Sequence, residues 1–237
     1  MAGCSRSVVS NQSGPHPRLP ERVRRHLRHP SRRPPAAHSQ AAFAALAASI
    51  DPARALVLDA GCGTGASTAR LAEVHPEAQV IGIDRSAHRL ARRPPLPANA
   101  RLLRAELADF WRLALAAGWS LQHHYLLYPN PWPKARHLGR RWQGSPLFPV
   151  ILALGGTLEL RSNWRLYLEE WVAALALAGV AAAVEPLAVD SPLTPFECKY
   201  HTSGQPLWCC RVRLLGHEFS SSCEGHGSRS GAVDSSR

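Results

Sequence analysis

The sequence predicts an α/β protein with a doubly wound, mostly parallel seven-stranded sheet, helices on both faces and an antiparallel edge strand. Three observations support this fold class. Strand-like apolar runs alternate with helix-like segments between residues 55 and 178, as in parallel sheets covered by helices. The first run leads into alternating glycines, which allow a sharp turn from a strand into a helix. The last two runs have no helical pattern between them, which predicts the antiparallel edge.

Each expected strand is a short apolar run bounded by Gly, Pro or polar residues. In chain order the expected strands are residues 55–60, 79–84, 101–105, 122–128, 157–161, 180–189 and 207–215. The first five alternate with helices, so we expect them to be parallel.

The expected helices show apolar residues at helical spacing or a clear end signal. Phe43 and Leu46 have this spacing in the first helix. Pro76 ends the second helix, and Gly118 and Gly179 close two later ones. In chain order the helices are residues 38–50, 67–75, 86–93, 107–117, 147–154 and 167–178.

Composition predicts one globular domain with two flexible ends. Residues 1–37 are rich in Arg, Pro, Ser and His, and residues 218–237 are rich in Ser and Gly, so both are expected to be disordered. Residues 38–217 form the expected domain. The longest apolar run, residues 171–184, is too short to cross a bilayer, and the N-terminus has no apolar signal segment. We therefore expect a cytoplasmic protein, with a monomer favoured.

The net charge of +11 is concentrated in two places. Residues 1–37 contain eight arginines and one glutamate, and residues 134–141 contain four basic residues and no acid. The rest of the chain is neutral. This distribution indicates a polyanionic partner, and nucleic acid is the one we expect. A basic tail without a partner is the alternative for the N-terminal segment.

The six cysteines include no C-x-x-C pair, and neither they nor the 12 histidines show the spacing of a metal site. We expect reduced thiols that mostly fill the core, and no bound metal.

The strongest local signal is a glycine motif at the end of the first strand. Asp59 precedes Gly61, Gly63 and Gly65, and Asp84 ends the second strand. An acid at that position can bind both hydroxyls of a ribose. An acid before the glycines would repel a pyrophosphate but suits a cation, and S-adenosylmethionine carries an ammonium and a sulfonium and no phosphate. A nicotinamide cofactor and a turn that binds nothing are the alternatives.

Glu106 follows the third strand. A polar side chain there can meet an adenine, and a solvated loop glutamate is the alternative.

A second signal follows the fourth strand, at the edge where doubly wound sheets place their ligands. The run from Tyr125 to Arg141 contains three prolines, which fix the loop around Asn130. Trp132 offers a stacking surface, and the basic residues after it offer contacts to phosphates.

Three motifs in this order resemble the tRNA (guanine-N7)-methyltransferases, a family of class I S-adenosylmethionine-dependent methyltransferases with a Rossmann-like fold. The loop is similar to the family's P-[DN]-P-W-x-K-x-R-H-x-x-R-R. Residues 161–167, R-S-N-W-R-L-Y, resemble T-D-W-x-x-Y, and residues 194–197, T-P-F-E, resemble T-x-F-E. The resemblance covers roughly residues 50–215.

The resemblance implies S-adenosyl-L-methionine as cofactor, tRNA as partner and (guanine(46)-N7)-methylation in the tRNA variable loop as the reaction. It implies that Asn130 lies beside both cofactor and target base, as the catalytic residue. The residues implied to bind the cofactor are Asp59, Gly61, Gly63, Gly65, Asp84, Glu106 and Asn130. Those implied to bind the substrate are Lys134, Arg136, Arg140, Arg141, Asn163, Thr194 and Glu197.

The chain departs from the family pattern in the substrate pocket. Asn130 and Asn163 stand where the family usually has Asp, and Asp59 stands where it usually has Glu. Guanine N7 has a lone pair and no proton, so its methylation needs no general base. Two alternatives stay open: methylation of an exocyclic base amine, for which an Asn oxygen is suited, and an RNA-binding, non-enzymatic relic of the family.

Overall fold

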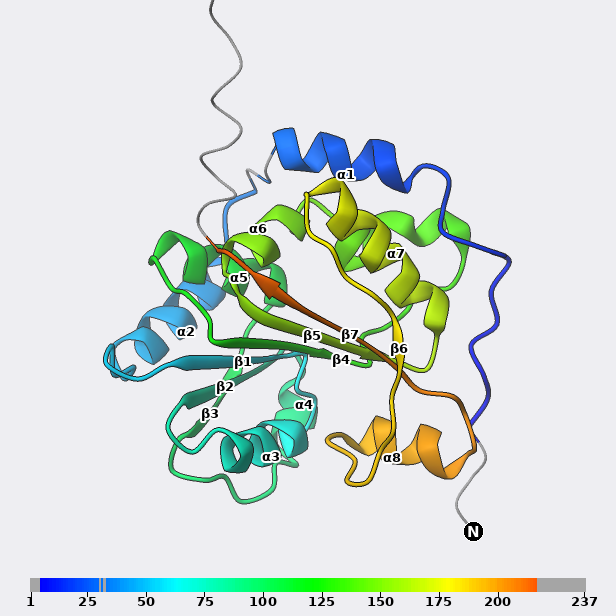
Figure 1. Ribbon diagram of the computed structural model, residues 1–237. Helices are drawn as coiled ribbons and strands as arrows, with labels where there is room; N and C mark the ends of the chain where they lie inside the picture. The colour runs from blue at the N-terminus through cyan, green and yellow to red at the C-terminus, as the bar shows by residue number, and fades with distance from the viewer. Residues whose placement is uncertain (1–4, 30, 32, 217–237) are drawn as a thin grey trace, which may run out of the picture.

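The computed structural model describes residues 5–29, 31 and 33–216. Its strands are β1 (Leu56–Ala60), β2 (Gln79–Asp84), β3 (Ala100–Arg104), β4 (His123–Leu127), β5 (Gly156–Ser162), β6 (Glu185–Pro186) and β7 (Trp208–Leu214). They form one seven-stranded sheet in the order β3-β2-β1-β4-β5-β7-β6 (Figure 1). The strands from β3 to β5 are parallel, and β7 runs antiparallel to both of its neighbours. The predicted fold class is confirmed.

The helices are α1 (Leu19–Arg28), α2 (Ala37–Ala47), α3 (Ala66–Val74), α4 (Ala87–Leu90), α5 (Leu107–Ala116), α6 (Phe148–Ala153), α7 (Arg165–Leu177) and α8 (Pro195–Thr202). Two short 3-10 helices, η1 (Ala135–Arg140) and η2 (Trp142–Gly144), follow β4. The helices from α2 to α7 lie where the sequence predicted them, with ends that differ by a few residues.

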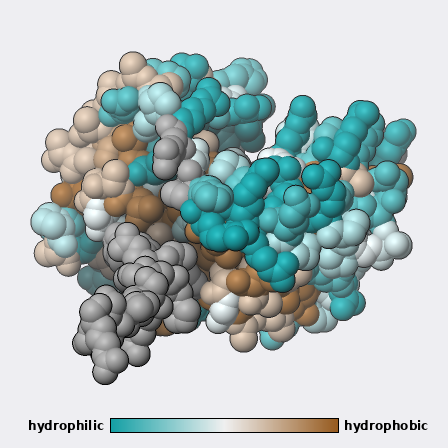
Figure 2. Space-filling model, turned by 90° about the horizontal axis from the view of Figure 1, so that it is seen from above, coloured by the Kyte–Doolittle hydropathy of each residue, from teal (hydrophilic) through white to brown (hydrophobic). Residues whose placement is uncertain are grey.

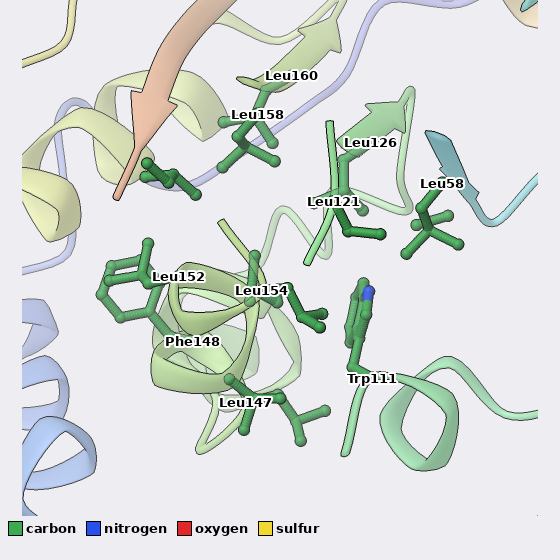
Figure 3. Close-up of a cluster of buried hydrophobic side chains, with 14 of the residues drawn as sticks. Leu58, Trp111, Leu121, Leu126, Leu147, Phe148, Leu152, Leu154, Leu158 and Leu160 are labelled. Atoms are coloured by element: carbon green, nitrogen blue, oxygen red, sulfur yellow. The ribbon is translucent and has the colours of Figure 1, made fainter. Parts of the chain in front are cut away.

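The core lies on both faces of the sheet. Because side chains alternate along a strand, β1 contributes to both. Leu58 packs on one face with Trp111 of α5 and Phe148 of α6 (Figure 3), while Val57 packs on the other with Leu71 of α3. The helices α2, α5, α6 and α7 cover the first face, and α3 and α4 lie on the second (Figure 1).

The N-terminal segment corrects the sequence-based expectation of disorder. Helix α1 packs on α6 and α7 as an outer layer, with Leu19 and Val23 almost fully buried and His26 on the same side (Figure 1). Pro20 lies in its first turn, where a proline is tolerated. Arg24, Arg25 and Arg28 are exposed, while Arg22 is half-buried and its Nε donates to Gly144 O at 3.1 Å. The surface seen from above is mixed, with hydrophilic residues gathered on the right of the view and apolar residues on the left (Figure 2). The few buried residues of α1 lie along one side of the helix, and the average composition of residues 1–37 does not reveal them.

The C-terminal part contains two further corrections. The strand expected at residues 180–189 is limited to the two residues of β6, so the antiparallel strand β7 lies inside the sheet and β6 is its edge. In the sequence, helix α8 follows β6 and precedes β7, in a segment where no helix was expected. The tail predicted at residues 218–237 lies outside the described residues.

The four cysteines of the described part are free, and three of them are buried. Within the same residues, no helix is long and apolar enough to cross a membrane.

If α1 is part of the folded core, Leu19→Ala should lower the free energy of unfolding by about 2–5 kcal/mol, the usual cost of removing a buried leucine side chain. Arg24→Ala, on the exposed side of the same helix, should change it by less than about 0.5 kcal/mol. Urea denaturation of the full chain measures both. Equal stability of the two variants would mean that α1 does not contribute to the fold.

Candidate active site

The glycine motif forms the turn between β1 and α3. Gly61, Gly63 and Gly65 have φ angles of 86°, 62° and 81°, in the left-handed region that suits glycine. A Cβ atom at Gly65 would lie 2.6 Å from Leu102, so this glycine also permits close packing. A Cβ atom at either of the other two would meet nothing nearer than 3.8 Å. The turn therefore has space above its first two glycines, where a ligand can approach the backbone.

Asp59 is buried beneath this turn. Its Oδ2 accepts hydrogen bonds from Ser67 Oγ at 2.6 Å and Thr68 Oγ1 at 2.7 Å, both in the first turn of α3. Burial raises the pKa of Asp59 to about 6, the nearby Asp84 acts in the same direction, and the two hydroxyl groups oppose the shift. Because these donors are neutral, a bound cation would offset the cost of burying the carboxylate.

Asp84, at the end of β2, is joined directly to the turn. Its Oδ2 accepts a hydrogen bond from Gly63 N at 3.1 Å, and its Oδ1 accepts one from Ser86 N at 2.8 Å. Arg89 Nη2 lies 3.1 Å from the same Oδ1, and its side chain is 40% exposed. Binding of a ribose diol at Asp84 requires Arg89 to move, and its exposure leaves it free to do so.

Glu106 lies one strand further along the same edge. It is the residue before α5, its side chain is exposed, and it makes no capping hydrogen bond. The preceding residue, Ala105, donates its N–H to Asp84 O at 3.3 Å, which places Glu106 close to the ribose position. A contact between Glu106 and an adenine stays a prediction.

These residues fit S-adenosylmethionine. Asp59 supplies negative charge for its ammonium and sulfonium groups, Asp84 supplies acceptors for its ribose, and the turn leaves space against the backbone. The buried carboxylate of Asp59, directly before the glycines, would repel a pyrophosphate, so a nicotinamide cofactor fits less well.

The proline-rich loop leaves β4 beside this turn, because β4 pairs with β1. Asn130 is exposed, and its Oδ1 accepts the Trp132 N–H at 3.2 Å in an Asx-type turn. Tyr128 and Trp132 have φ angles of 51° and 47°, which non-glycine residues rarely adopt. Such strain persists only where surrounding contacts hold it, and it is common at functional sites.

Arg141 supplies the contacts that hold this loop, which corrects its expected role in RNA binding. The side chain is 0% exposed, and Nη1 lies 2.6 Å from both carboxylate oxygens of Glu170 in α7. Its Nε and Nη2 donate to Trp132 O at 3.2 and 3.0 Å. Residues before α1 join the same cluster, since Gln12 Nε2 donates to Glu170 at 3.2 Å and Gln12 Oε1 accepts from Arg141. A side chain so enclosed cannot reach an RNA phosphate.

The other basic residues of the loop, Lys134, Arg136 and Arg140, are exposed as expected. The guanidinium of Arg140 lies over the Trp132 ring, 4.6 Å from its centre, so one face of that ring is already covered. Lys134 and Arg136 line a surface hollow of about 440 Å³ together with residues 9–11. These three charges are available to a polyanion.

The T-x-F-E motif begins α8 and has a mainly structural role. Thr194 caps the helix by accepting the Glu197 N–H at 2.9 Å. Glu197 is 0% exposed, and its Oε1 accepts hydrogen bonds from Arg161 Nη1 at 2.9 Å and Tyr128 Oη at 2.8 Å. The motif thus ties α8 to β5 and to the loop after β4. Glu197 is enclosed in this structure, and its contact with a substrate stays a prediction.

Asn163 follows β5, the strand next to β4, and is partly exposed. Its Nδ2 donates to Gln205 Oε1 at 2.8 Å. The carboxyl ends of β3, β2, β1, β4 and β5 thus bring Glu106, Asp84, the glycine turn, Asn130 and Asn163 to one edge of the sheet.

The residues missed from the sequence are mostly partners of those that were identified. They are Ser67, Thr68, Arg89, Arg161 and Glu170. Ser67 and Thr68 could have been predicted as hydrogen-bond donors to Asp59, because hydroxyl residues directly after the glycines lie in the first turn of the helix. Arg161 lies at the start of the segment 161–167 but was not singled out, and Glu170 carries no local signal that separates it from surface charges.

The fold is similar to solved structures of methyltransferases. The 16S rRNA methyltransferase KamB matches 74% of the chain and 94% of its own length, with 19% identity and a TM-score of 0.53. The antibiotic-resistance methyltransferase Kmr matches 73% and 93%, with 20% identity and a TM-score of 0.51. At these identities the likeness defines the fold, which is that of the class I methyltransferases.

A protein-family model described as "Putative methyltransferase" matches residues 53–210. The tRNA (guanine-N(7)-)-methyltransferase of Leifsonia xyli subsp. xyli is 30% identical, over 67% of this chain and 75% of its own length. That of Mycobacterium ulcerans is 35% identical, over 64% of this chain and 60% of its own. The chain belongs to this tRNA (guanine-N7)-methyltransferase family of S-adenosylmethionine-dependent methyltransferases.

The burial of Asp59 makes the stability of the folded protein depend on pH. Because the pKa of Asp59 is higher in the folded protein than in the unfolded chain, its contribution to stability should decrease as the pH rises from about 4 to about 6. Asp59→Asn should therefore stabilise the cofactor-free protein by up to about 3 kcal/mol at pH 7 and by little below pH 4. The variant should also bind S-adenosylmethionine more weakly. Thermal unfolding at both pH values and calorimetry measure these effects, and a destabilised variant at pH 7 would contradict them.

Arg140 and Arg141 form a matched pair for separating loop anchoring from RNA binding. Arg141→Ala leaves Glu170 buried without its cation, so it should lower the free energy of unfolding by about 3–5 kcal/mol. Arg140→Ala should leave stability almost unchanged and should weaken RNA binding with a shallower salt dependence. Urea denaturation and RNA binding at several salt concentrations measure both. Equal effects of the two variants on both quantities would restore the RNA-contact role of Arg141.

Proposed function

We propose that this protein transfers the methyl group of S-adenosylmethionine to guanine N7 of a tRNA, at a guanine in the variable loop. The observation that carries the proposal is the pairing of β1 with β4. It places the acidic glycine turn and the Asn130 loop at one edge of the sheet, with Lys134, Arg136 and Arg140 exposed beside them. The names of the similar proteins from Leifsonia xyli and Mycobacterium ulcerans support the choice of base and atom.

When bound, S-adenosylmethionine supplies an electrophilic methyl group on a sulfonium. Asp59 and Asp84 would hold and orient it through charge and ribose hydrogen bonds. The N7 lone pair of guanine attacks without losing a proton, so the protein needs no general base there. The task of the loop is to align the base, and alignment alone can lower a barrier by roughly 7–11 kcal/mol.

Asn130 is the residue of the loop that we assign to the base. Its Oδ1 already accepts the Trp132 N–H, which fixes the amide while leaving its NH₂ group free to donate. An amide orients the base but gives less stabilisation than a carboxylate to the positive charge that develops on it. Because an amide oxygen has a second lone pair, Oδ1 can still accept a hydrogen bond from an exocyclic amine, and the nucleoside product distinguishes the two reactions.

Incubation of the protein with an unmodified tRNA transcript and labelled S-adenosylmethionine, followed by nucleoside mass analysis, tests the proposal. We expect 7-methylguanosine from the natural chain and a loss of product with Asp84→Ala, which removes the ribose acceptor. Asn130→Asp should raise turnover by up to about 10²- to 10³-fold, since it adds a carboxylate beside the developing charge.

A control transcript with the variable-loop guanine replaced by adenine should give no 7-methylguanosine. An N6-methyladenosine product would favour the amine-methylating alternative instead. Cofactor binding without any methylated product would favour the RNA-binding relic.

A further inference from the structure

Three aromatic side chains form a continuous row from the loop after β4 to the first turn of α8. The rings of Tyr128 and Tyr200 lie 5.6 Å apart at 47°, and those of Tyr200 and Phe196 lie 6.2 Å apart at 25°. Tyr128 is two residues before Asn130. The row therefore starts on the loop that carries Asn130 and ends at the surface.

The outer end of the row is open. Phe196 is 50% exposed, and it is the aromatic residue among the large hydrophobic residues exposed in the described part of the chain, the others being Val9, Val74 and Leu215. Tyr200 is partly buried, which raises the pKa of its hydroxyl group. One ring face at the end of an aromatic row is thus presented to solvent.

The position of Phe196 is fixed by its neighbours. Thr194 caps α8, and the adjacent Glu197 is held by Arg161, by the Tyr128 hydroxyl and by the Leu193 N–H at 2.6 Å. These contacts attach the first turn of α8 to the carboxyl edge of the sheet, on the side of α3 and α4 (Figure 1). The row is therefore a built surface and not the chance exposure of one side chain.

The exposed charges of α8 and of the loop that carries Asn130 favour an anion. Lys199 and His201 are exposed on α8, and Lys134 and Arg136 are exposed on the loop that begins with Tyr128. Glu197, the acid within α8, is buried and paired with Arg161. Aromatic faces next to exposed cations are the combination that binds unpaired nucleotides, through base stacking and phosphate contacts.

We propose that Phe196, backed by Tyr200 and Tyr128, stacks on an unpaired base of the RNA substrate next to the nucleotide to be methylated. The inference rests on the proposed function for the identity of the substrate and adds to it a specific binding surface on α8. Removal of the ring should then weaken RNA binding without affecting the cofactor site.

The test compares Phe196→Ala, Phe196→Leu and Phe196→Trp in the full chain. The leucine variant keeps an apolar side chain and loses the aromatic face, while the tryptophan variant keeps the face. We expect the first two to bind an unmodified tRNA transcript about 5- to 150-fold more weakly, the range found for loss of one stacked base. The tryptophan variant should bind within about twofold of the natural chain.

Cofactor affinity and melting temperature should stay unchanged in all three variants, and Val74→Ala, an exposed apolar change on α3, serves as the matched control. A single-stranded RNA with 2-aminopurine beside the guanine gives a direct readout, since its fluorescence should fall on binding to the natural chain and less with Phe196→Ala. Unchanged RNA affinity in Phe196→Ala would overturn the proposal, as would equal affinity of the leucine and phenylalanine forms. Because these readouts measure binding, they are independent of whether 7-methylguanosine is the product.

Discussion

The burial of the Asp59 carboxylate near the end of the central strand is the constraint on which the cofactor side of the molecule depends. The hydroxyl groups of Ser67 and Thr68 satisfy it, and they can reach it because the glycine turn starts α3 close to the end of β1. Gly82, the register partner of Asp59 on β2, belongs to the same arrangement. A Cβ atom at Gly82 would collide with Thr68 Oγ1. One buried acid thus explains the turn, the start of α3 and an unusual glycine inside a strand.

A second buried carboxylate, Glu170, is neutralised in a different way. Arg141 contacts both of its oxygens, and Gln143 and the His16 N–H complete its hydrogen bonding. Removing either charge would leave the other uncompensated, which is the costly case for a buried pair. The pair attaches the strained Trp132 segment and residues 12–16 to α7, and so it determines the shape of the loop that carries Asn130.

The two buried acids have different roles: Asp59 is suited to bind a cationic ligand, and Glu170 holds the structure together. Asp59 has neutral donors and a pKa raised to about 6, so its full negative charge is costly until a cation binds. Glu170 already has its cation and can bind no other. The contacts with RNA that we propose are made by the exposed cations of the loop, through charge, and by the aromatic row of α8, through stacking.

The sequence by itself determined the fold class, the cofactor turn and the family. Those features depend on local patterns: apolar runs that become strands, glycines that accept positive φ angles, and acids at fixed distances after them. Tertiary structure alone decided the roles of Arg140 and Arg141, which are adjacent and identical in type. One lies over a half-buried tryptophan, and the other is enclosed by Glu170 and Gln12. It also decided that α1 is folded, because Leu19 and Val23 find α6 and α7 as partners only when distant parts of the chain meet. Burial depends on those distant partners, and the residues beside a side chain in the sequence do not reveal them.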